Sequence, residues 1–257
     1  MASDFRFSPK FTLIDEKRVE QVLDEWYESE MIFGMPFLEL FKTSLDKSDS
    51  GINPFQAVNK VRRCYNLVKL FNSSHSVSGD IAEAGVFRGS TARLMVEVMN
   101  AGQLNMTDKE IVLFDSFEGL PDLGSEDIPT RYPPDAEGSE PFYRHTPRRF
   151  SNTNMELVAG MFADTPSVVL QKGWIPNSFA EHLNRYYSFV HIDVDLYQST
   201  KDCLEYFVPR MNEGGIILCD DYLSLRFPGA RIAWDLFCKQ NNIQFITLDN
   251  YQSAIFF

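Results

Sequence analysis

Four aspartates stand as two pairs, each at the end of an apolar run. Asp193 and Asp195 close the run FVHIDVD. Asp220 and Asp221 follow the run GIILC. If these runs are neighbouring parallel strands, their carboxyl ends meet at one edge of a sheet, where α/β proteins bind ligands. Crowded carboxylates repel one another unless they take up protons or bind a cation. Because hard oxygen ligands favour Mg²⁺ over Zn²⁺, the pattern predicts a magnesium site.

A magnesium ion held there could bind a substrate hydroxyl and lower its pKa. Asp195, displaced from the strand edge, would then be available to take the proton. His191 lies deeper in the strand, on the opposite face from Ile192, so we interpret it as a core or supporting histidine. The alternative is that the aspartates are only a solvated strand end, which is the ordinary reading of a single acidic residue.

A second candidate site is the segment EAGVFRGST, residues 83–91, between an expected strand and an expected helix. Gly85 lacks a Cβ and so permits a tight turn and close backbone approach. Gly89, Ser90 and Thr91 would open the helix, whose free N–H groups can face a polar ligand. A plain strand-to-helix turn without a ligand is the alternative.

The surroundings of this loop indicate which cofactor it would take. The loop departs from the G-x-G-x-x-G dinucleotide pattern. Glu83 would repel a diphosphate, but it suits the ammonium group of a methionine-type cofactor. Asp115 ends the next strand and can accept hydrogen bonds from ribose hydroxyls. After the third strand, Gly173 and Trp174 could supply a flat wall for an adenine ring, unless Trp174 is a core residue. We therefore expect S-adenosylmethionine rather than NAD.

The elements that must position these residues alternate between short apolar strands and amphipathic helices from residue 79 onward. The expected strands cover residues 79–84, 111–115, 167–171, 189–194, 215–219, 243–248 and 252–256. The expected helices cover residues 89–101, 151–162, 177–184, 199–210 and 229–241. Such alternation predicts an α/β fold with a mostly parallel sheet. Three residues separate the last two strands, which must form an antiparallel hairpin. This is the outline of the S-adenosylmethionine-dependent methyltransferase sheet.

Two segments lie outside this pattern. Residues 1–75 have helical apolar spacing and are expected to form an N-terminal cap or oligomerisation segment before a catalytic domain at 76–257. Residues 119–150 carry six prolines and are expected to form a lid. We expect the acceptor between this lid and the apolar stretch 31–37. That stretch could instead pack against a second subunit, and we expect a homo-oligomer, a dimer or larger.

Composition narrows the possible partners. The formal net charge is -12 and the pI is near 4.8, which argues against nucleic acid. The sequence has no apolar run long enough for a membrane span, and its N-terminus lacks the features of a signal peptide. A cytoplasmic enzyme is the expectation. The four cysteines are far apart, so we expect them to be reduced and structural.

Taken together, these motifs resemble the macrocin O-methyltransferase family, which includes mycinamicin and novobiocin tailoring enzymes. The resemblance covers about residues 55–257. It rests on the blocks EAGVFRG (83–89), DSFEG (115–119), GW (173–174), HIDVDLY (191–197) and DDY (220–222).

The resemblance implies a class I methyltransferase fold, S-adenosylmethionine, Mg²⁺ and a small natural-product acceptor from secondary metabolism, such as a deoxysugar hydroxyl of an antibiotic. It assigns Asp193, Asp220 and Asp221 as metal ligands, with Asp195 or Asp193 as the base. The matching blocks also bring further residues into the expected cofactor site: Val86, Arg88, Ser116, Phe117 and Asp193.

Two other classes of function remain open at this stage. An NAD(P)-dependent oxidoreductase could use the same kind of sheet, but it should have a glycine-richer loop and a proton-relaying tyrosine or lysine. A non-catalytic cofactor-binding scaffold could keep Gly85 and Asp115, but it would have no use for four convergent aspartates.

Overall fold

The computed structural model describes residues 16–51, 57–103, 108–129, 149–224, 226–248 and 250–257. Its centre is a seven-stranded sheet in the order β5-β4-β3-β6-β7-β9-β8. The strands are β3 (Asp80–Ala84), β4 (Ile111–Asp115), β5 (Val168–Lys172), β6 (Tyr187–Ile192), β7 (Met211–Cys219), β8 (Ile246–Thr247) and β9 (Ser253–Phe256). All neighbours are parallel except β9, which runs antiparallel to both β7 and β8.

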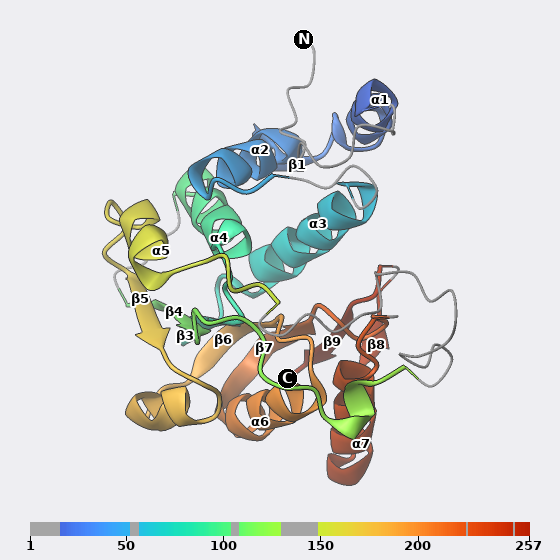
Figure 1. Ribbon diagram of the computed structural model, residues 1–257. Helices are drawn as coiled ribbons and strands as arrows, with labels where there is room; N and C mark the ends of the chain where they lie inside the picture. The colour runs from blue at the N-terminus through green and yellow to red at the C-terminus, as the bar shows by residue number, and fades with distance from the viewer. Residues whose placement is uncertain (1–15, 52–56, 104–107, 130–148, 225, 249) are drawn as a thin grey trace.

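Helices cover both faces of this sheet (Figure 1). The α-helices are α1 (Glu16–Tyr27), α2 (Phe37–Lys47), α3 (Ala57–Ser74), α4 (Ser90–Ala101), α5 (Met155–Met161), α6 (Tyr197–Phe207) and α7 (Gly229–Asn241). Alternation along the strands explains the two layers, because successive side chains point to opposite faces. Ile81, Phe189 and Ile216 join the core with α2, α3 and α4. Val190 and Ile217, one position on, join the core with α6 and α7.

The N-terminal helices share the core of the sheet. Phe71 on α3 packs edge-to-face on Phe189 of β6, with ring centroids 5.4 Å apart. Leu23 of α1 and Phe41 of α2 are buried in the same cluster. The helical segment expected over residues 1–75 is therefore, from residue 16 onward, a layer packed on the sheet. Residues 1–15 lie outside the described part.

The structure confirms the mostly parallel seven-stranded sheet and its C-terminal antiparallel hairpin. Some boundaries differ from the prediction. The strand expected over 243–248 is limited to Ile246–Thr247, and the helix expected over 177–184 is a 3-10 helix at Asn177–His182. A small hairpin of β1 (Met31–Ile32) and β2 (Met35–Pro36) was not expected.

The four cysteines are free and buried, as expected. None of the helices in the described ranges has the length and apolar character needed to cross a membrane.

Candidate functional site

A cleft of about 630 Å³ lies at the carboxyl edge of the sheet, where β3, β4 and β6 end. One wall comes from the loops that follow the strands, and the other comes from the helical layer, through α3 and the residues around Ser50. Eleven of the residues predicted from sequence line it: Gly85, Val86, Ser90, Thr91, Asp115, Ser116, Gly173, Trp174, Asp193, Asp195 and Asp221.

Gly85 brings the cofactor loop against the end of the neighbouring strand. Its φ is +87°, and a Cβ there would lie 1.9 Å from the carbonyl oxygen of Asp193. The N–H of Asp193 in turn donates to the carbonyl of Ala84 at 2.8 Å. Only glycine fits between these backbones, so the residue type fixes how closely the loop approaches the acidic residues.

The Asp115 carboxylate binds the backbone of the same loop. One oxygen, Oδ2, accepts the N–H groups of Val86 and Phe87 at 2.7 and 2.8 Å. The other, Oδ1, accepts the N–H of Phe117 at 2.6 Å. A carboxylate has about four acceptor positions. Asp115 therefore holds two loops together and keeps capacity for one further donor from the cleft.

Trp174, after β5, forms part of the same wall. Its side chain is 39% exposed, although it is a large aromatic residue. The N–H of Gly173 donates to the carbonyl of Asp115 at 2.9 Å, which ties the Trp174 segment to the end of β4. The indole therefore lies at the cleft surface and not in the core, and its contact with an adenine ring stays a prediction.

The acidic residues do converge, as the two strand ends predicted. The side chains of Asp193 and Asp221 lie close enough for each to shift the pKa of the other. The N–H of Asp195 donates to Oδ2 of Asp221 at 3.1 Å. Asp195 has a φ of +59°, a left-handed conformation that aspartate tolerates better than most residues. This turn takes Asp195 off the line of β6.

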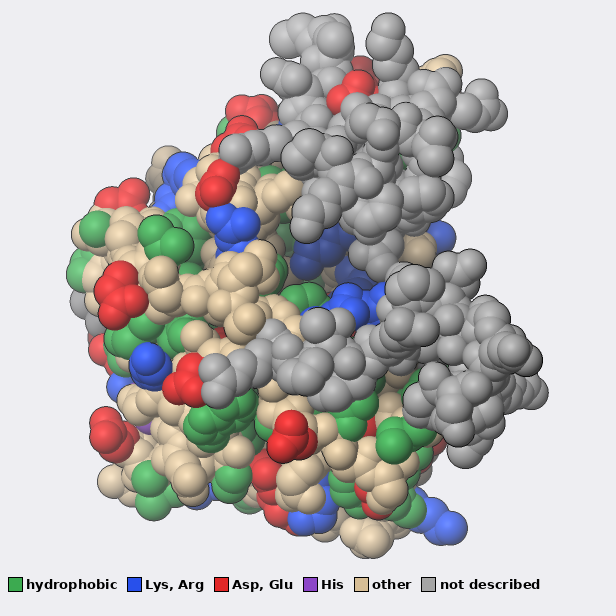
Figure 2. All heavy atoms as spheres, in the orientation of Figure 1, with side chains coloured by type: hydrophobic (Ala, Val, Ile, Leu, Met, Phe, Trp, Pro, Cys, Tyr) green, Lys and Arg blue, Asp and Glu red, His purple; other side chains and the backbone are tan. Residues whose placement is uncertain are grey.

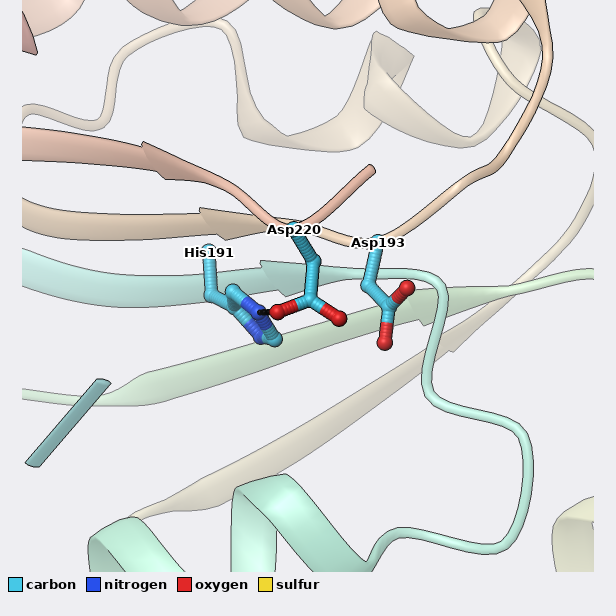
Figure 3. A group of neighbouring side chains, drawn as sticks. All are labelled: His191, Asp193 and Asp220. Carbon is cyan, nitrogen blue, oxygen red and sulfur yellow. Dashed lines mark ion pairs between the residues drawn. The ribbon is translucent and has the colours of Figure 1, made fainter. Parts of the chain in front are cut away.

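Asp220 lies on the inner side of this group, facing His191. Figure 3 shows its carboxylate between the imidazole and Asp193. A ring nitrogen of His191 and oxygens of Asp193 and Asp220 all lie within 4.8 Å of one another. Nε2 of His191 is 3.5 Å from Oδ1 of Asp220, and Gln252 donates to that same oxygen at 2.6 Å.

Glu83 occupies a different place from the one we predicted. It is fully buried, and its Oε1 pairs with Nδ1 of His191 at 2.8 Å. The two residues are in register on β3 and β6, so their side chains point to the same face of the sheet. Glu83 does not line the cleft. The geometry makes it a partner of His191, whose Nε2 lies 3.5 Å from Asp220 and has no hydrogen-bond partner among the described residues.

Arg63, on α3, pairs with three of the aspartates. Its Nη2 contacts Oδ2 of Asp220 and lies 3.9 Å from Oδ1 of Asp193 and 3.8 Å from Oδ1 of Asp221. One guanidinium nitrogen therefore lies within reach of all three predicted metal ligands. The carboxylates face a common position that suits a cation.

The pKa values reflect this crowding. Burial and then the charge of Asp193 raise the pKa of Asp195 to about 7. Burial and then the charge of Asp195 raise the pKa of Asp221 well above its ordinary value. Burial alone would raise the pKa of Asp193 too, but the charges of Arg63 and His191 hold it below its ordinary value. The group thus retains protons that a bound cation would displace.

The remaining predicted residues lie just outside the cleft. Arg88 pairs with Asp49 at 2.8 Å, and Phe117 is buried beneath the loop. Gly89 is the N-cap residue of α4. Asp220 is buried and does not line the cleft.

Sequence reasoning missed the basic side of the cleft, which includes Lys60, Arg63, Arg149 and Arg226. Figure 2 shows Lys and Arg side chains gathered in a hollow near the middle of one face. The signal that could have found them is charge balance, because buried carboxylates need cationic partners. The apolar stretch 31–37, expected near the acceptor, does not line the cleft. Ile32 and Phe37 are buried in the helical layer.

Both ends of the predicted lid lie at the cleft. Gly119, Leu120 and Pro121 line it at one end, and Arg149 and Phe150 line it at the other. The N–H of Leu120 donates to the carbonyl of Arg149 at 2.8 Å, which closes the base of the insertion. Residues 130–148 lie outside the described part, so the lid itself stays a prediction.

The sequence of this chain matches a known protein family and several known enzymes. A family model described as macrocin-O-methyltransferase matches residues 56–257. A tetracenomycin-C 4'-O-methyltransferase from Streptomyces olivaceus is 30% identical over 151 residues, which is 57% of this chain and 54% of that protein. The demethyldecarbamoylnovobiocin O-methyltransferase of Streptomyces niveus is 26% identical over 198 residues, which is 75% of this chain and 70% of that protein. This chain thus matches about half the length of the first relative.

Solved structures show the same fold. The O-methyltransferase NovP has a TM-score of 0.61 and 24% identity, and the match covers 76% of this chain and 79% of that one. A calicheamicin methyltransferase also has a TM-score of 0.61, with 20% identity and coverage of 85% and 91%. These likenesses confirm the class I methyltransferase fold. Since the family model matches residues 56–257, which include the whole sheet and the convergent aspartates, this chain belongs to the macrocin O-methyltransferase family.

Proposed function

We propose that this protein is a magnesium-dependent O-methyltransferase that moves the methyl group of S-adenosylmethionine to a deoxysugar hydroxyl of a small natural product. One observation carries the proposal. The loop suited to the methyl donor and the acidic group suited to a cation open into the same cleft, joined by the contact between Gly85 and Asp193. Family membership supports the methyl donor, and the relative from Streptomyces olivaceus acts on a rhamnosyl-tetracenomycin.

The residues fit both groups. The Gly85 loop and the remaining acceptor capacity of Asp115 suit the amino-acid and ribose parts of S-adenosylmethionine, and Trp174 suits its adenine. Asp193, Asp220 and Asp221 suit Mg²⁺, because they are oxygen donors around a position that already attracts a guanidinium. When bound, the ion would contribute Lewis-acid stabilisation to an acceptor hydroxyl.

The protein side of the chemistry is proton transfer and orientation. A sugar hydroxyl has a pKa far above 7, so its proton needs an acceptor late in methyl transfer. Asp195 lies in the cleft beside Asp193 and off the predicted ligand set, which suits it to accept that proton. Gln252 would hold Asp220 in place from the core side, and Glu83 would orient the His191 ring beside it.

Transfer of labelled methyl from S-adenosylmethionine tests the proposal. Purified protein should methylate rhamnosylated or similarly glycosylated aglycones and not the bare aglycones. EDTA should abolish the transfer, and added Mg²⁺ should restore it. Full activity after rigorous chelation would remove the metal from the proposal. Failure to bind S-adenosylhomocysteine, together with binding of NADH, would favour an oxidoreductase instead.

A further inference from the structure

Arg63 takes the place in the acidic group that a divalent cation would need. Its Nη2 contacts Asp220 and lies 3.9 and 3.8 Å from oxygens of Asp193 and Asp221. This nitrogen is so close to all three carboxylates that no room is left among them for a second cation. We propose that Arg63 is the resident counter-ion of the metal-free site and that a divalent cation binds only by displacing its guanidinium. The inference rests on the proposed cation site.

Asp220 is held independently of the Arg63 side chain, although Gln252, which holds it, also donates to the Arg63 carbonyl at 3.3 Å. Gln252 is fully buried and donates its Nε2 to Oδ1 of Asp220 at 2.6 Å, which leaves Oδ2 to Arg63. Gln252 also accepts a hydrogen bond from Asn66, one turn further along α3, at 3.0 Å. The carboxylate therefore keeps its orientation when its cationic partner changes, and exchange requires movement of the Arg63 side chain alone.

The Arg63 side chain has room to move in the cleft. It is 25% exposed, and it lines the cleft together with Asn59 and Lys60 of the same helix. A planar guanidinium on a flexible stem can leave three carboxylates without a shift of the helix backbone. A divalent ion brings two charges to a site where Arg63 brings one, so it neutralises the acidic group more completely. Metal-free protein would thus keep its carboxylates paired with Arg63 until the ion arrives.

Arg63 and Mg²⁺ compete for the same carboxylates. Because the arginine contacts must be broken when Mg²⁺ binds, the apparent affinity for Mg²⁺ is lower than it would be without Arg63. Calorimetric titration of Mg²⁺ into the protein, without S-adenosylmethionine, measures this. Arg63→Gln should bind Mg²⁺ about tenfold more tightly than wild type, as expected when a charge-assisted hydrogen bond no longer has to be broken. Arg62→Gln is the matched control, since Arg62 is the preceding residue of α3 and does not line the cleft. It should leave the affinity unchanged.

A measurement on the unaltered chain avoids dependence on a variant that could fold poorly. Phenylglyoxal labelling of Arg63, followed by peptide mass spectrometry, should increase several-fold when Mg²⁺ saturates the protein. Labelling of Arg62 should stay constant. Unchanged or reduced labelling of Arg63 at saturating Mg²⁺ would overturn the displacement.

Equal or weaker Mg²⁺ binding by Arg63→Gln would also overturn it, because Arg63 would then support the metal site. S-adenosylhomocysteine binding, measured on the same samples, reports the donor site separately. If neither protein binds Mg²⁺ while both bind S-adenosylhomocysteine, the cation site itself is wrong. That result would remove the magnesium requirement and leave the methyltransferase assignment standing.

Discussion

Asp193 and Asp195 are two residues apart in sequence but play different parts in the site. Asp193 continues β6, with its N–H bonded to Ala84, and it faces Arg63. Asp195 lies beyond the strand, in a left-handed turn, and its backbone is tied to Asp221. The first position suits a ligand to a cation, and the second suits a base next to one.

Asparagine at these two positions should separate the two roles. Asp195→Asn should lower kcat by about 10²–10⁴, the usual contribution of a positioned base, with little change in Mg²⁺ or S-adenosylmethionine affinity. Asp193→Asn should reduce kcat and Mg²⁺ affinity together. Steady-state kinetics and calorimetry on both variants measure this. Near wild-type turnover of Asp195→Asn across pH 6–9 would assign the base to Asp193 or to solvent.

For single residues, the sequence predicted the position correctly where a residue follows the end of a strand. Gly85, Asp115, Asp193 and Asp221 could be placed in one cleft because parallel strands deliver their carboxyl ends to the same edge. Glu83 could not be placed correctly, because its role depends on being in register with His191 across two strands. Register is set by packing and is not visible in either strand alone.

Among the elements, the stem of the predicted lid is anchored more firmly than its composition suggests. Asp127, in the 3-10 helix at Ser125–Asp127, is 2% exposed. Its carboxylate accepts the N–H groups of Tyr197 at 2.7 Å and Gly124 at 2.9 Å. Tyr197 begins α6, directly after the turn that holds Asp195. The N-terminus of α6 therefore connects Asp127, in the lid stem, with Asp195, the candidate base.

Gly229, at the start of α7, makes this anchor possible. A Cβ at residue 229 would lie 1.9 Å from Oδ1 of Asp127 and 2.7 Å from the backbone N of Tyr197. Gly229→Ala should therefore destabilise the fold by about 1–3 kcal/mol, the usual cost of overpacking. Gly160→Ala is the control, because nothing lies within 4 Å of a Cβ on this helical glycine. It should stabilise by about 0.5–1 kcal/mol. Denaturant unfolding of both variants gives the comparison, and equal effects would contradict the proposed close contact.

Element types were predictable for the sheet and less so for its surroundings. The parallel strands are apolar on both faces, and this is a strong signal. Arg63 was missed because α3 has an ordinary amphipathic pattern, with Val61, Cys64 and Val68 buried. Nothing in that pattern shows which residue at the edge of the apolar face will reach the strand ends. Only the packing of α3 against the sheet determines it.

For the whole molecule, the helical layer and the sheet form a continuous core, so we predict one cooperative unfolding transition. Phe71→Ala should cost about 3–5 kcal/mol, since it removes the fully buried ring that joins α3 to β6. Phe256→Ala, at a phenylalanine that is 50% exposed, should cost much less. Calorimetric unfolding checks both expectations. Two separated transitions, with Phe71→Ala affecting only one, would show that the layers fold independently.

The proposed function requires this cleft to bind the methyl donor through the Gly85 loop and Asp115. Calorimetric titration with S-adenosylhomocysteine measures that binding, with NADH as the competing ligand. Wild type should bind S-adenosylhomocysteine and not NADH. Asp115→Ala should weaken binding by about 1.5–3 kcal/mol, as the loss of a charged acceptor does. The melting temperature of the variant controls for loosening of the loop that Asp115 also holds. Absence of binding by wild type, or unchanged affinity in a folded Asp115→Ala, would contradict the account.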